Sequence, residues 1–65
     1  MEKELERLGA KITELRIEVT AKADAAELNV LLDKTEESQI RYDLLENLQH
    51  SLEDAEATVE MLLEI

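Results

Sequence analysis

Residues 33–37 read DKTEE, and this short polar stretch decides the fold of the whole chain. Apolar residues recur every three or four positions on both sides of it, but its first, second and fifth residues are charged where that pattern should continue. Thr35 offers a hydroxyl that can cap a helix, and the two carboxylates after it suit the positive end of a helix dipole. The stretch predicts a turn at about residues 33–35 between two helices.

The segment before the turn has the pattern of one amphipathic helix over about residues 2–32. Its apolar positions share one helical face, and they are Leu5, Leu8, Ile12, Leu15, Val19, Ala23, Ala26 and Val30. Gly9 lies beside this face, where it costs about 1 kcal/mol relative to Ala. A close approach of a second helix would explain that glycine.

The segment after the turn predicts a second helix over about residues 36–64. Its face consists of Leu45, Leu48, Leu52, Ala55, Val59 and Leu62. Leu44, Leu63 and Ile65 make this face wider than one partner helix can cover. The width predicts further helices, and two hairpins forming a four-helix bundle as a twofold homodimer are the simplest closed solution.

Charge favours folding the two segments back on each other. The net charge of −10 divides into −2 for residues 1–32 and −8 for residues 33–65. An antiparallel hairpin lays the acidic segment along the one that holds five of the seven bases. We therefore expect an all-α, coiled-coil-like antiparallel hairpin that assembles into a bundle. The alternatives are one continuous helix in a coiled coil, or a short extra helix that starts at Asp24 after a break.

The composition excludes several classes of protein. There is no Cys for a disulfide or a thiolate metal site, and a single His cannot form a zinc centre. The longest apolar runs have three residues, far short of the roughly 20 that a membrane span needs. The charged N-terminal residues do not resemble a signal peptide, so we expect a cytoplasmic protein that relies on oligomerisation for stability.

His50 is the one residue that invites a metal or catalytic interpretation. Glu46, Glu53 and Asp54 lie three or four positions from it, within reach on a helix. This cluster falls opposite the apolar face, however, and we interpret it as solvated surface. With no phosphate-binding glycine loop and no pocket that would shift a carboxylate pKa, we expect neither a cofactor nor an enzyme activity.

Two sets of residues are candidates for binding. The predicted self-association interface comprises Leu5, Leu8, Ile12, Leu15, Val19, Ala26, Leu44, Leu45, Leu48, Leu52, Ala55, Val59 and Leu62. The predicted acidic face comprises Glu53, Asp54, Glu56, Glu60 and Glu64, and it would attract a basic protein and repel nucleic acid and anionic lipid.

These patterns indicate a small non-catalytic scaffold or adaptor that acts by self-association. One alternative is an acidic module or inhibitor that binds a basic protein surface. Another is a subunit of a hetero-oligomeric helical bundle, which would be poorly stable alone.

Overall fold

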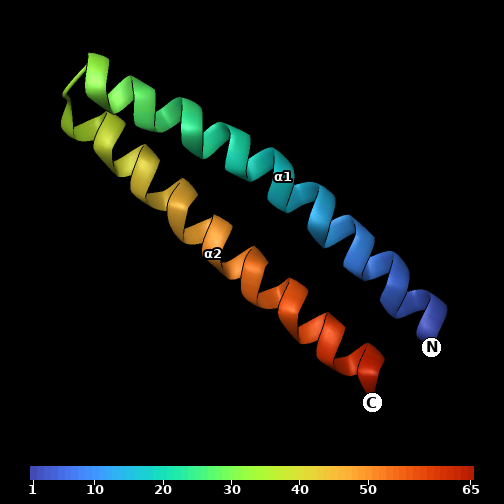
Figure 1. Cartoon of the computed structure of the whole chain (residues 1–65). Helices are drawn as coiled ribbons and strands as arrows, with labels where there is room; N and C mark the ends of the chain where they lie inside the picture. Colours follow the sequence, from blue (N-terminus) through green and yellow to red (C-terminus); the bar gives the residue numbers. More distant parts are fainter.

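The computed structural model describes all 65 residues and is an antiparallel hairpin of two α-helices, α1 (Glu2–Leu32) and α2 (Glu36–Glu64) (Figure 1). These bounds match the predicted helices, and the all-α hairpin is confirmed. The continuous helix is wrong, because the chain reverses at residues 33–35. The extra helix from Asp24 is also wrong, because α1 continues through that residue without a break.

The turn is held by side-chain hydrogen bonds that begin α2. Thr35 has extended backbone angles (φ −100°, ψ 157°), and its Oγ1 accepts a hydrogen bond of 3.1 Å from the backbone N–H of Ser38. The predicted N-cap is therefore confirmed. The Ser38 hydroxyl donates a 2.7 Å hydrogen bond to the Asp33 carbonyl, and Ser38 is only 4% exposed. This bond ties the first turn of α2 to the end of α1.

The hairpin is a rod. Its principal extents are 46 × 14 × 12 Å, and its radius of gyration is 14.8 Å, whereas a compact domain of this length has roughly 10.7 Å. Both termini lie at the end opposite the turn (Figure 1). Neither helix contains an apolar segment long enough to cross a lipid bilayer.

The seam between the helices buries small apolar side chains. Its buried apolar residues are Val19, Ala23, Ala26 and Val59. The helices approach closely at Gly9, where a Cβ atom would lie 3.2 Å from Val59 Cγ1. The predicted reason for this glycine is therefore confirmed.

The seam uses only part of each predicted apolar face. Its residues at one set of seven-residue spacings are buried or half-buried, and they are Leu5, Ile12, Val19, Ala26, Leu45, Leu52 and Val59. The seam is completed by Gly9, Arg16, Ala23, Val30, Tyr42, Gln49, Glu56 and Leu63. The rest of each predicted face turns away from the partner helix, on the side opposite to Gly9, where the two helices approach closely.

Candidate interaction surfaces

Five leucines of the predicted self-association set are left out of the seam and remain exposed. We call them the leucine face, which comprises Leu8, Leu15, Leu44, Leu48 and Leu62, each between 44% and 64% exposed. Ala55 of α2 lies among them and is half-buried. Together with the seven seam residues, they account for the predicted self-association set. The set therefore divides into residues that join the two helices and residues that face solvent.

The leucines of α1 and α2 lie on the same side of the rod. Lys22 and Asn29 continue the seven-residue spacing of Leu8 and Leu15, and Arg41 continues that of Leu48 and Leu62. Lys22, Asn29 and Arg41 line one groove between the helices, with Ala25, Ala26 and Leu45. The groove has a volume of about 480 Å³ and marks the turn end of the leucine face.

The surface area of the hairpin is large for its mass. The chain has a mass of 7.4 kDa and exposes 5187 Å², whereas a compact monomer of that mass exposes roughly 4200 Å². The excess of roughly 1000 Å² is comparable to the area of about 800 Å² that each partner contributes to a standard protein interface. The leucine face provides apolar side chains for such an interface.

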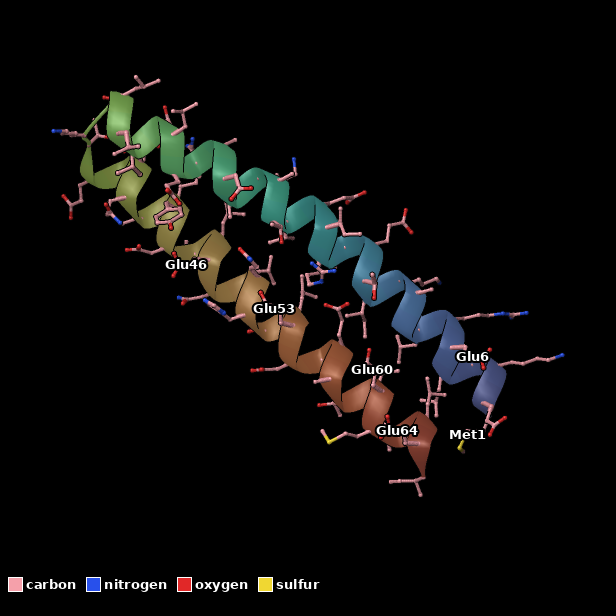
Figure 2. The ribbon with its side chains drawn as sticks, in the orientation of Figure 1. Met1, Glu6, Glu46, Glu53, Glu60 and Glu64 are labelled. Atoms are coloured by element: carbon pink, nitrogen blue, oxygen red, sulfur yellow. The ribbon has the colours of Figure 1, made fainter.

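The opposite side of the rod is acidic. Glu46, Glu53 and Glu60 follow one another at seven-residue spacing on α2, and Figure 2 shows them in succession with Glu64, next to Glu6 on the neighbouring end of α1. Glu27 of α1 faces the same side, because it shares a shallow pocket with Glu46 and Tyr42. We call Glu6, Glu27, Glu46, Glu53, Glu60 and Glu64 the acidic face.

The predicted acidic set is divided by the structure. Glu53, Glu60 and Glu64 belong to the acidic face, whereas Asp54 lies on the outer side of α2, away from α1. Glu56 turns into the seam, where its carboxylate pairs with Arg16 and accepts a 2.7 Å hydrogen bond from the Thr13 hydroxyl. Glu56 therefore links the helices and is not available to a basic partner in this conformation.

Tyr42 makes a second polar link between the helices, which the sequence analysis did not predict. Its hydroxyl donates a 3.1 Å hydrogen bond to Glu27. The neighbouring carboxylates of Glu46 and Glu27 favour the protonated hydroxyl and so raise the pKa of the phenol above its ordinary value. In an antiparallel hairpin, residues that face each other have numbers with nearly the same sum. The pair 27 and 42 has the same sum as the pair 13 and 56, so the register of the hairpin predicts that Tyr42 lies beside Glu27.

His50 has one acidic neighbour within ion-pair distance. Its Nε2 lies 3.8 Å from Glu46 Oε1, and both side chains are largely open to solvent. The structure contains no group of three or more His, Asp or Glu side chains arranged to hold a metal ion. The rod therefore exposes one apolar side and one acidic side to solvent. Comparison with protein families, curated proteins and solved structures finds no significant match to this chain.

Proposed function

We propose that the protein is a small, non-catalytic scaffold or adaptor that binds a second copy of itself through the leucine face and forms a four-helix bundle. The observation that supports this proposal is the leucine face itself. Five leucines on one side of the rod remain 44% to 64% exposed, while only four apolar residues are buried. Contiguous exposed apolar patches of this kind mark binding sites in soluble proteins.

A second hairpin suits this surface better than a small ligand does. The leucine face follows nearly the whole rod, from Leu8 and Leu62 near the termini to Leu44 near the turn. A copy of the chain offers a face of the same length and the same apolar character, as a twofold interface requires. Packing the two faces together would also give the leucines the buried environment that one hairpin cannot provide.

Sedimentation equilibrium of the wild-type chain and two single variants tests the proposal. Leu48→Glu places a charge within the leucine face, and we expect it to convert the dimer into a monomer. Leu31→Glu is the matched control, because Leu31 is 64% exposed near the turn and lies outside that face. We expect this variant to remain dimeric. Circular dichroism checks that both variants stay helical, and a wild-type chain that sediments at 7.4 kDa at about 100 μM would refute the proposal.

A second candidate function is binding of a basic protein through the acidic face. It is favoured by the regular succession of Glu46, Glu53 and Glu60 along one side of α2 (Figure 2). Salt distinguishes the two functions. A complex held by the acidic face should dissociate as salt rises from about 0.05 to 0.5 M, because the Debye length shrinks, whereas a dimer held by leucines should persist.

A further inference from the structure

We infer that the two hairpins of the dimer lie in the same direction, with both turns at one end and α1 of each copy over α2 of the other. This inference rests on the self-association proposed above and specifies its geometry. Two twofold arrangements can bring the leucine faces together. With the axis along the rod, the turns share one end; with the axis across the rod, each turn lies beside the partner's termini.

The charges of the two helices favour the same-direction arrangement. The half of the chain with α1 has a net charge of −2, and the half with α2 has −8. In the same-direction bundle each helix is adjacent only to helices of the other kind, so the two acidic helices lie on a diagonal. In the opposite arrangement α2 packs directly against α2 of the partner, which brings the two most acidic helices together.

The bases beside the leucine face support the same choice. Lys11 and Lys22 lie on that side of α1, at helical spacing from Leu8 and Leu15, together with Glu4 and Glu18. The residues that α2 contributes to this side between 44 and 62 are uncharged, and they are Leu44, Leu48, Ser51, Ala55, Thr58 and Leu62. In the same-direction bundle both lysines lie over the partner's acidic helix. In the opposite arrangement Lys11 lies beside the partner's Lys22, because the two are nearly equidistant from the middle of α1.

The distribution of leucines along the rod leads to the same result. Leu8 and Leu62 lie near the termini, and the turn end of the same face holds Asn29 and Arg41. With both turns at one end, Leu8 packs over the partner's Leu62, and the polar residues meet polar residues. With the turns at opposite ends, Leu62 faces Arg41 of the other copy, so a leucine is buried against a charge.

Distances between nitroxide labels on the full chain test the arrangement. The chain has no Cys, so Lys34→Cys places a single label in the exposed turn, and His50→Cys places one near the middle of the rod. We expect roughly 20–30 Å at position 34 and roughly 30–40 Å at position 50, because the copies are about two helix layers apart and His50 lies on the side away from the leucine face. In the opposite arrangement His50→Cys would still give a distance of that size, whereas Lys34→Cys would give about the 46 Å length of the rod.

The outcomes separate this inference from the proposed function. The expected distance at position 50 with a long one at position 34 would overturn the same-direction arrangement and leave the dimer intact. No interchain distance at either position would overturn self-association and the arrangement together. The expected distances at both positions support both.

A charge reversal provides a second test that does not depend on labels. Lys11→Glu should weaken dimerisation roughly two- to fivefold at low salt, because it places an acid over the partner's acidic helix. Lys3→Glu makes the same change in net charge away from the leucine face and is the matched control. In the opposite arrangement Lys11→Glu would instead tighten the dimer, since it would place opposite charges at positions 11 and 22. Tighter binding than the control would therefore overturn the inference.

Discussion

The closest approach of the two helices, between Gly9 and Val59, provides a quantitative test of the fold. A Cβ atom at position 9 would lie 3.2 Å from Val59 Cγ1, which is closer than ordinary carbon contacts. Val59 is 6% exposed, and a β-branched side chain in a helix has one strongly preferred rotamer. The valine cannot turn aside without strain, so Gly9→Ala must push the helices apart.

The magnitudes follow from two opposing effects. Replacing a helical glycine by alanine stabilises by about 1 kcal/mol, while overpacking costs about 2 kcal/mol. We therefore expect Gly9→Ala to destabilise the hairpin by about 1 kcal/mol. Val59→Ala removes two buried methyl groups and should cost about 2 kcal/mol. In that background the clash is absent, so Gly9→Ala should stabilise by about 1 kcal/mol, and the two substitutions should show a coupling energy of about 2 kcal/mol.

Urea and thermal unfolding followed by circular dichroism measure this cycle. All variants are compared at one protein concentration, because the proposed association would contribute to the apparent stability. A change of 1 kcal/mol shifts Tm by about 4–8 °C for a chain of this size. The control is Ala10→Gly at an exposed position, which should cost about 1 kcal/mol in both backgrounds. If Gly9→Ala stabilises the wild-type and Val59→Ala chains equally, positions 9 and 59 are not in contact and the register is wrong.

Three further experiments test the polar contacts. Ser38→Ala should lower the free energy of unfolding by about 1 kcal/mol, because the hydroxyl of this buried residue bonds a carbonyl of the turn; an unchanged Tm would contradict that role. The phenol of Tyr42 should ionise above its ordinary pKa, and Glu46→Gln should bring the ultraviolet titration back toward that value. Because the pKa of Tyr42 is higher in the folded chain than in the unfolded chain, the contact stabilises the fold at neutral pH. This stabilisation is lost as the pH rises through the folded-state pKa. Alanine substitutions of Arg16 and Glu56 should show a coupling energy of about 1 kcal/mol that falls with added salt, since both side chains are partly buried; zero coupling would argue against the pair.

The hairpin and its helix bounds could be predicted because their causes are local. The polar residues at 33–37 interrupt both apolar patterns, and Thr35 caps the helix that follows. Gly9 was also interpretable, because a glycine inside a helix is costly unless another backbone needs the space. These signals depend only on neighbours within one or two helical turns.

The rotation of the helices about their own axes could not be predicted, because it depends on contacts between them. Residues such as Ile12 have leucines on one side, Leu8 and Leu15, and the small or polar residues Gly9 and Arg16 on the other. Both sides continue the helical spacing, so periodicity alone does not choose between them. In the structure, the side of α1 that holds Gly9 faces α2. Arg16 lies on that side, and Glu56 of α2 pairs with it in the seam.

This choice connects the fold to the proposed function. The seam lets the two helices approach closely at Gly9, but only four apolar residues of the chain are buried. The leucines of the leucine face stay exposed, where the proposed partner would bury them. Because burial of that face depends on association, the stability of the hairpin and the affinity of the dimer have a common origin. A change that filled the seam with leucines would strengthen the single hairpin and remove the surface on which we expect the second copy to bind.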